Sequence, residues 1–273
     1  MEIQWSLVLF TAITGMGACL FSFSMLQALL GRGKMPDKTV CITSFAMLVV
    51  GGCISVTHII HHLDRIVEAL GHPTSGIFIE ALGTGIMCLL IAVYFIMLYR
   101  KASETGLKVV GTVAAIVGVV FAFECGNSYF MGSRPAWTTL LLPLGYCLTA
   151  LAGGSALNLL LKAVGKAERD VIAFAGKLCI AGSALGVLGA VAFAISAGGY
   201  VANAAGAIAW TALMIVLLAA TLLLGLYSCK KEGNAVSVGA CATATAFVGV
   251  VAYRVVMWLV GTPVLDFFMM SLS

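Results

Sequence analysis

The residues best suited to chemistry lie between His58 and Glu80. All four histidines of the protein fall within fifteen residues of this stretch, at positions 58, 61, 62 and 72. The second long apolar run ends here, and the third begins at Ile77, three residues before Glu80. Imidazole titrates near neutral pH, and a carboxylate inside a membrane segment usually marks a functional site. The spacing therefore predicts proton exchange at a membrane boundary, with His58 and Glu80 as the central groups.

Arg254 is the third candidate, because it lies inside the last apolar run. At 1.5 Å per residue, Arg254 is about 10 Å below the outer end of its helix, Glu80 is about one turn in, and His58 is near a helix end. Three ionisable groups at similar depth predict a shared polar cavity. The alternative is that Glu80 and Arg254 form a structural ion pair. Three further residues close the fourth apolar run on the same side and are interpreted mainly as boundary groups: Glu124, Asn127 and Tyr129.

Neither a metal site nor a haem is predicted. His58 and His62 are four residues apart and could ligate a metal from one helical face, but only His72 or Asp64 offers a third ligand. A haem between helices needs histidines on different spans, and only one histidine lies within a span. The nine cysteines are scattered without a Cys-x-x-Cys pair, so we interpret them as small packing residues.

The composition identifies the class of protein that positions these residues. Hydrophobic residues make up 62% of the 273 positions and charged residues only 10%, which excludes an ordinary soluble domain. The first residues carry no basic cluster or cleavage pattern, so we expect a retained first helix rather than a signal peptide. We predict an all-α integral membrane protein, with a single membrane domain over 1–273 and candidate halves at 1–161 and 171–273.

Eight apolar runs are long enough to span a bilayer, which requires about 20 residues. They occur at 4–30, 39–60, 77–99, 109–130, 138–161, 171–197, 205–228 and 236–261. Alternate connections carry eleven of the fifteen basic residues, whereas the other connections carry only Arg65 and Arg134. The positive-inside rule then places both termini and the histidine loop outside. Within that loop, apolar residues from Ile59 to Leu70 recur at helical spacing, which predicts an amphipathic segment along the interface.

These features resemble one family. Eight spans, a histidine at the end of the second span and a glutamate twenty-two residues later are similar to the membrane anchor subunit of the dimethyl sulfoxide reductase type. Two further stretches are also similar to that family, namely Gly17-Ala-Cys-Leu-Phe-Ser-Phe-Ser24 and the arginine-bearing Ala252-Tyr-Arg-Val-Val-Met-Trp258. The sequence departs from the family at Ile59-Ile60-His61-His62, where Leu-Gly-x-Pro usually follows the histidine.

The resemblance implies a function, cofactors and partners. Such anchors lie in the cytoplasmic membrane, contain no haem or cluster, oxidise menaquinol, and bind an iron–sulfur subunit and a molybdopterin catalytic subunit. Carried over, His58 matches the quinol-site histidine and Glu80 the essential glutamate. We expect His58 to take a proton from quinol and Glu80 to relay it outward. The neighbours expected to complete the quinol site are Arg254, His61, His62 and Arg65. No nucleic acid partner is expected.

Two other functions compete with this interpretation. A secondary transporter of a small anion or hydrophobic solute would use Lys177 and Arg254 as substrate contacts. Transporters tend to place such charges near the midplane on broken helices, and only Pro143 of the five prolines lies within a span. The second alternative is a purely structural anchor without a quinol site.

The topology can be tested by reporter fusions. We expect fusions in the loop at 31–38 to report the inside and fusions at 61–76 to report the outside, because basic residues gather in the first loop and not in the second. The reverse result would move the partner subunits to the cytoplasmic face.

Overall fold

The computed structural model describes residues 2–59, 75–230 and 234–262. Eight of its helices are long and apolar enough to cross a membrane. They are α1 (Trp5–Leu29), α2 (Lys38–Ile59), α4 (Gly76–Tyr99), α5 (Glu104–Asn127), α6 (Leu141–Val164), α7 (Arg169–Ser196), α9 (Ala207–Lys230) and α10 (Ala235–Val260). The predicted all-α bundle of eight membrane helices is thus confirmed.

The outer surface of the bundle is apolar, as a lipid-facing surface must be. Exposed side chains include Leu89 and Ile96 on α4, Ile116 on α5 and Leu223 on α9. An apolar surface that continues around several helices would make a water-soluble protein aggregate, whereas lipid tails solvate it well. The chain therefore folds by packing its small and polar residues inward and leaving large aliphatic residues outside.

Several helix boundaries differ from the sequence prediction by two to five residues, and two of these differences have a clear local cause. Helix α5 begins at Glu104, five residues earlier than expected, because Ser103 accepts a hydrogen bond from the Gly106 amide at 3.2 Å and so caps the helix. Helix α6 continues to Val164, since Lys162 turns inward instead of leaving the membrane. Two short elements were also missed: the 3-10 helix η2 (Pro135–Trp137) and α8 (Gly198–Asn203).

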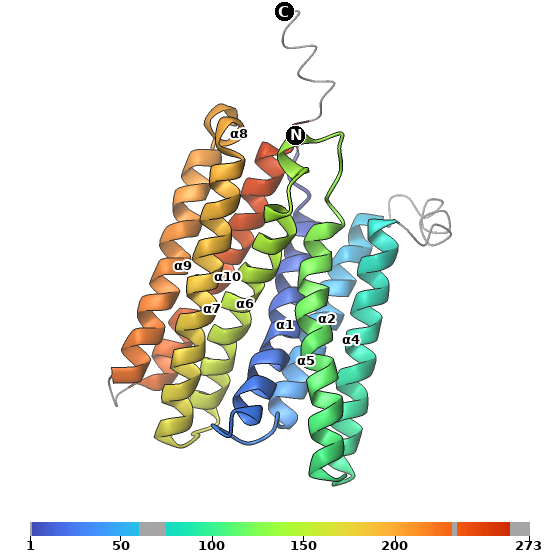
Figure 1. Ribbon diagram of the computed structural model, residues 1–273, viewed down its shortest axis with the longest axis vertical. Helices are drawn as coiled ribbons and strands as arrows, with labels where there is room; N and C mark the ends of the chain where they lie inside the picture. Colours follow the sequence, from blue (N-terminus) through green and yellow to red (C-terminus); the bar gives the residue numbers. More distant parts are fainter. Residues whose placement is uncertain (1, 60–74, 231–233, 263–273) are drawn as a thin grey trace, which may run out of the picture.

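The eight helices form two groups of four (Figure 1). In one group α1, α2, α4 and α5 pack around one another, and in the other α6, α7, α9 and α10 do the same. Helix α1 packs against α6, and these two central helices are the most buried of the eight. The connection 128–140 joins the two packing groups, whereas the sequence suggested candidate halves at 1–161 and 171–273. The division of the membrane domain into halves stays a prediction.

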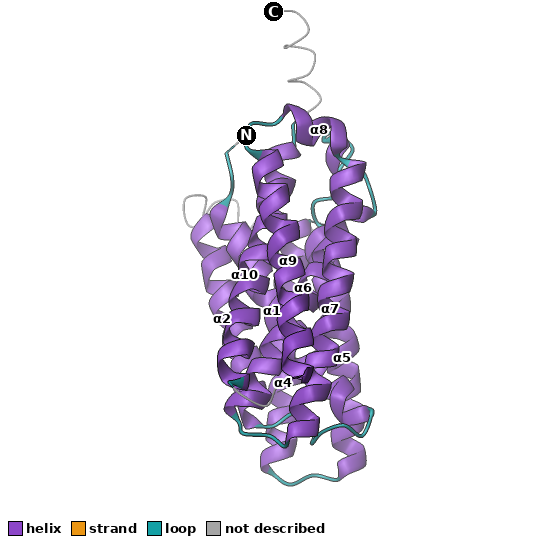
Figure 2. Cartoon of the chain, turned by 90° about the vertical axis from the view of Figure 1, so that its left-hand side faces the viewer, coloured by secondary structure: helices purple, strands orange, loops and turns teal. Residues whose placement is uncertain are grey.

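Short loops join the helices at the two ends of the bundle (Figure 2). The end that carries the connections at 30–37, 100–103 and 165–168 holds most of the basic residues, and we call it the basic end. The opposite end holds the start of α1, the start of α4 and the end of α10. We call it the Glu80 end.

Glycines allow the backbones of the two helix groups to pack at short distance. A Cβ atom at Gly154 of α6 would lie 2.5 Å from the backbone carbonyl carbon of Cys19 and 2.7 Å from the amide of Leu20, both on α1. Backbone atoms cannot move aside as a flexible side chain can. The small-residue run at 152–156 thus allows α6 to pack closely against α1.

We expect Gly154→Ala to lower the free energy of unfolding by about 1–3 kcal/mol, the usual cost of overpacking. Gly85→Ala is the matched control, since that glycine is also inside a helix but has nothing within 4 Å of an added Cβ. The control should be neutral or stabilising by up to about 1 kcal/mol. Denaturant titration of both variants in the same lipid checks this, and equal effects would contradict the proposed α1–α6 contact.

Candidate functional site

Glu80 lies in the second turn of α4 and is almost completely buried, with 5% of its surface exposed. The helix starts at Gly76 because Ser75 accepts a hydrogen bond from the Phe78 amide at 3.2 Å. At 1.5 Å per residue, Glu80 is therefore about 6 Å from the helix end. Its Oε1 atom is buried and has no hydrogen-bond partner in the described part of the chain. A buried carboxylate oxygen without a donor is costly, and this marks Glu80 as a functional candidate.

The end of α5 supplies the surroundings of Glu80. Ser128, the residue after α5, interacts with the Glu80 carboxylate, and its hydroxyl donates to the Glu124 carbonyl at 3.0 Å. Tyr129 follows and is buried. Burial raises the pKa of the Tyr129 phenol well above its usual value, and the nearby negative charge of Glu80 raises it further. Tyr129 is therefore a neutral hydrogen-bonding group beside a carboxylate.

His58 is the second-last residue of α2, so its backbone lies at the same end of the bundle as Glu80. Its side chain is outside what the structure describes. His61, His62 and Arg65 also lie outside the described residues, as do Asp64, His72 and the predicted amphipathic segment. The roles of these residues stay predictions.

Arg254 is fully buried between α1, α6 and α10. Its guanidinium makes three hydrogen bonds: Nε donates to Thr11 Oγ1 at 3.0 Å, Nη2 to the Thr11 carbonyl at 3.1 Å, and Nη1 to the Val250 carbonyl at 3.0 Å. The guanidinium carbon also lies 4.5 Å from the centre of the Tyr146 ring, which is cation–π geometry. These contacts explain how α10 carries an arginine at a depth from which it cannot reach water.

Glu80 and Arg254 do not form the ion pair that the sequence allowed. The ion pair found within the described residues joins Lys108 to Glu104 at the other end of α5, with 2.7 Å between Nζ and Oε1. Tyr129, Tyr146 and Cys125 each interact electrostatically with both Glu80 and Arg254. The two charges are thus connected through aromatic and thiol side chains of α5, α6 and the loop after α5.

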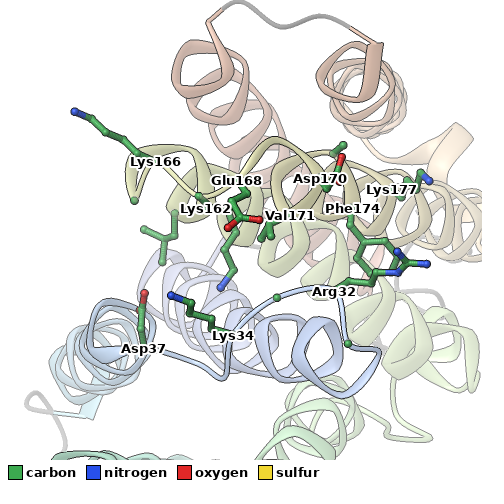
Figure 3. A pocket seen from close by; sticks show the side chains of 16 residues that line it. Arg32, Lys34, Asp37, Lys162, Lys166, Glu168, Asp170, Val171, Phe174 and Lys177 are labelled. Carbon is green, nitrogen blue, oxygen red and sulfur yellow. The ribbon is translucent and has the colours of Figure 1, made fainter.

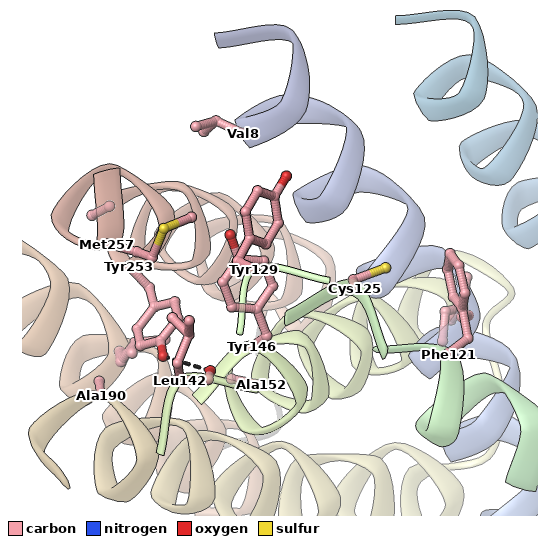
Figure 4. Packing of buried hydrophobic residues seen from close by; sticks show 14 of the residues in the cluster. Val8, Phe121, Cys125, Tyr129, Leu142, Tyr146, Ala152, Ala190, Tyr253 and Met257 are labelled. Carbon is pink, nitrogen blue, oxygen red and sulfur yellow. Dashed lines mark hydrogen bonds between the residues drawn. The ribbon is translucent and has the colours of Figure 1, made fainter. Parts of the chain in front are cut away.

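Aromatic rings fill the Glu80 end of the bundle (Figure 4). Tyr129 stacks on Tyr146 with 5.8 Å between ring centres and meets the edges of Trp137 and Trp258 at 5.8 and 5.9 Å. The Trp137 indole donates to the Met257 carbonyl at 2.8 Å, whereas Trp258 Nε1 is buried and has no partner within the part of the chain that the structure describes. Aromatic residues at span ends are common in membrane proteins. The sequence therefore carried no specific signal for this cluster.

The remaining candidates are separated by the fold. Glu124 Oε2 accepts a hydrogen bond from Asn127 at 3.1 Å, which fits the boundary role predicted for both residues.

Lys177 lines a pocket at the basic end, far along the bundle from Arg254 near the end of α10. The transporter alternative used Lys177 and Arg254 as contacts of one substrate, and the structure does not bring them together. No group of three or more metal-ligating side chains occurs among the described residues.

The geometry allows proton exchange at the Glu80 end. Glu80 Oε1 can accept a hydrogen bond or a proton, and the aromatic cluster beside it offers an apolar wall for a flat ring. Trp258 Nε1 is a second group that could bond to a ligand.

A double-mutant cycle can measure the coupling energy between Thr11 of α1 and Arg254 of α10. Thr11→Val removes the hydroxyl that accepts from Arg254 but preserves side-chain shape. We expect Thr11→Val and Arg254→Lys to be coupled by about 1.5 kcal/mol or more in unfolding experiments, the usual value for a hydrogen bond to a charged group.

Thr14→Val is the matched control for this cycle. Thr14 is equally buried on α1, but its hydroxyl donates only to the Phe10 carbonyl of the same helix, at 2.8 Å. Thr14→Val should show no coupling to Arg254→Lys. Equal coupling for both threonines would mean that the hydroxyl of Thr11 has no special role.

Comparison with known proteins gives one family. A family model described as DMSO reductase anchor subunit (DmsC) matches residues 1–261. The match includes all eight membrane helices and therefore both Glu80 and Arg254. No curated protein matches the chain.

Proposed function

The chain belongs to the DMSO reductase anchor subunit (DmsC) family, and we propose that it binds and oxidises menaquinol at the Glu80 end of the bundle. One observation carries this proposal, namely that the buried Oε1 atom of Glu80 has no hydrogen-bond partner among residues 2–59, 75–230 and 234–262. The Glu124 carboxylate, in contrast, accepts a hydrogen bond from Asn127. A buried carboxylate oxygen that lacks a donor near the end of a membrane helix is suited to a ligand that donates a hydrogen bond.

The residues around Glu80 have the hydrogen-bonding and aromatic groups that a quinol would need. The hydroxyl of a quinol would donate to Glu80 Oε1 and satisfy the buried acceptor. The rings of Tyr129 and Tyr146 would give the flat quinol ring an apolar and aromatic environment. Ser128 lies against the same carboxylate and would help to orient it.

Proton transfer is the part of the reaction that this chain performs. Oxidation of a quinol releases two electrons and two protons, so the site needs proton acceptors and a route to water. In our proposal His58 takes a proton from the quinol hydroxyl, because imidazole titrates near neutral pH. Glu80 relays a proton toward the loop that follows α2. His61, His62 and Arg65 in that loop would complete the site and the route outward.

Arg254 acts on this site from a distance. Its three hydrogen bonds hold it to Thr11 and Val250, so it does not contact Glu80. Its positive charge lies behind Tyr146 and Tyr129, which also interact with Glu80. We propose that Arg254 stabilises negative charge that develops near Glu80 during proton transfer.

The electrons leave to partner subunits. Membership of the family implies association with the other subunits of a DMSO reductase complex. We propose that a ferredoxin-like iron–sulfur subunit docks at the Glu80 end, takes both electrons and passes them to a molybdopterin catalytic subunit. This places the Glu80 end, with both termini, on the outer side of the cytoplasmic membrane. The chain then supplies quinol binding, orientation and proton exits, while the redox chemistry belongs to the quinone and the clusters.

Two substitutions test the proposal in the assembled complex. His58→Ala should lower quinol-dependent turnover by roughly 10²–10⁴-fold, the typical loss for a general base. Glu80→Gln preserves shape but cannot accept a proton as a carboxylate does, so turnover should fall while binding of a quinone-site inhibitor is retained. Stopped-flow oxidation of a menaquinol analogue, together with inhibitor titration, separates these effects.

Glu124→Gln is the matched control for Glu80→Gln. Glu124 is a partly buried carboxylate at the same end of the bundle, but it is already hydrogen-bonded to Asn127. Its substitution should leave turnover unchanged. If Glu80→Gln and His58→Ala complexes assemble fully and turn over quinol at the unmodified rate, the proposed site is wrong.

A further inference from the structure

A large polar pocket opens at the basic end of the bundle (Figure 3). Its volume is about 1010 Å³, and it lies between the loop after α1, the end of α6 and the start of α7. None of the residues at the Glu80 end takes part in it. The quinol proposal therefore leaves this pocket without a role.

The pocket is held open by hydrogen bonds rather than by chance loop placement. Helix α1 ends where Gly31 adopts a left-handed conformation, with φ at 67°, which turns the chain back over the bundle. The Gln27 amide then donates to the Arg32 carbonyl at 3.1 Å and to the Val171 carbonyl at 2.8 Å. One buried side chain thus fixes the loop after α1 against α7.

Basic side chains dominate the pocket lining. Five basic residues line it, namely Arg32, Lys34, Lys162, Lys166 and Lys177. Three acidic residues also line it, namely Asp37, Glu168 and Asp170. Within the described residues none of the five cations forms an ion pair with these acids. The Asp37 carboxylate instead accepts a hydrogen bond from the Val40 amide at 3.0 Å and so caps α2. The lining thus has an excess of positive charge that these carboxylates do not neutralise by contact.

Lys162 is the strongest sign of an anionic ligand. Its side chain is buried, with 9% of its surface exposed, and its Nζ donates to Ser24 Oγ at 3.3 Å. An ammonium group has three donors, so two remain for another partner. Lys34 points to the same part of the pocket as Lys162, whereas Lys166 points away from it (Figure 3). The charge of Asp37 acts on Lys162, but the two groups form no contact ion pair within the described residues. Two ammonium groups that converge near hydrocarbon therefore favour a further anion in contact with them.

We propose that this pocket binds the phosphate group of an anionic phospholipid. Basic pockets between membrane helices are suited to such headgroups, because several ammonium groups can bond to one phosphate. The pocket lies at the helix ends, at the depth where lipid phosphates lie. Its wall also contains apolar side chains, including Leu161, Val171 and Phe174, which suit the glycerol and first methylenes of a lipid better than a free ion. Arg32 lies over Phe174, with 6.0 Å from its guanidinium carbon to the ring centre, and forms part of the rim.

Lipid titration of the delipidated full-length protein tests the proposal. Native mass spectrometry would measure binding of phosphatidylglycerol and of phosphatidylcholine, with inorganic phosphate as a competitor. We expect phosphatidylglycerol to bind more tightly than phosphatidylcholine. Lys34→Gln combined with Lys162→Gln should weaken phosphatidylglycerol binding by roughly fivefold for each lysine, or about 25-fold together.

The control variant loses the same number of positive charges, but at positions outside the pocket. Lys101→Gln combined with Lys230→Gln removes two exposed lysines from the same end of the bundle and should leave binding unchanged. If the double pocket variant does not fold, Lys34→Gln alone carries the test, because this side chain is exposed. Equal loss in the control, equal binding of the two lipids, or full displacement of lipid by inorganic phosphate would each overturn the proposal.

Discussion

A charge inside a membrane must be satisfied by neighbouring helices, and Arg254 meets this constraint by joining α1, α6 and α10. An unsatisfied charge at this depth costs about 2.5–3.5 kcal/mol on insertion scales. Three hydrogen bonds and the Tyr146 ring offset that cost. Helices α1 and α10 must in turn remain in contact, because Arg254 would otherwise lose its hydrogen bonds to Thr11. The order of the helices around α1 and α6 depends on this contact and on the close glycine packing beside it.

The central helices α1 and α6 have interacting polar side chains at both ends of the bundle. At the Glu80 end, Thr11 of α1 and Tyr146 of α6 hold Arg254, and Tyr146 in turn stacks on Tyr129 beside Glu80. At the basic end, Ser24 of α1 contacts Lys162 of α6, while Asn158 of α6 donates to Gln27 of α1 at 3.0 Å. Between these two sets of contacts, the helices pack closely at Gly154.

The two ends suit opposite charges. The Glu80 end presents a buried carboxylate oxygen that has no donor among the described residues, and it fits a ligand that gives up protons. The pocket at the basic end has more basic than acidic side chains, without ion pairs between them in the described part of the chain, and it fits a ligand with negative charge. In our proposals the first property serves proton release from a quinol, and the second serves binding of an anionic lipid headgroup.

The sequence alone determined the membrane class, the number of spans, the basic end and the candidacy of Glu80. Hydropathy and loop charge depend on local composition, and a carboxylate within an apolar run is visible without any contact. The sequence also resembled the anchor subunits of the dimethyl sulfoxide reductase type, and the family match confirms that resemblance. Sequence could not decide whether Glu80 and Arg254 pair, since that depends on which helices are neighbours. The helix contacts place Tyr129 and Tyr146 between them and turn Lys162 inward toward Ser24. Packing in three dimensions decided these points, because only close approach of distant segments determines which polar groups find partners.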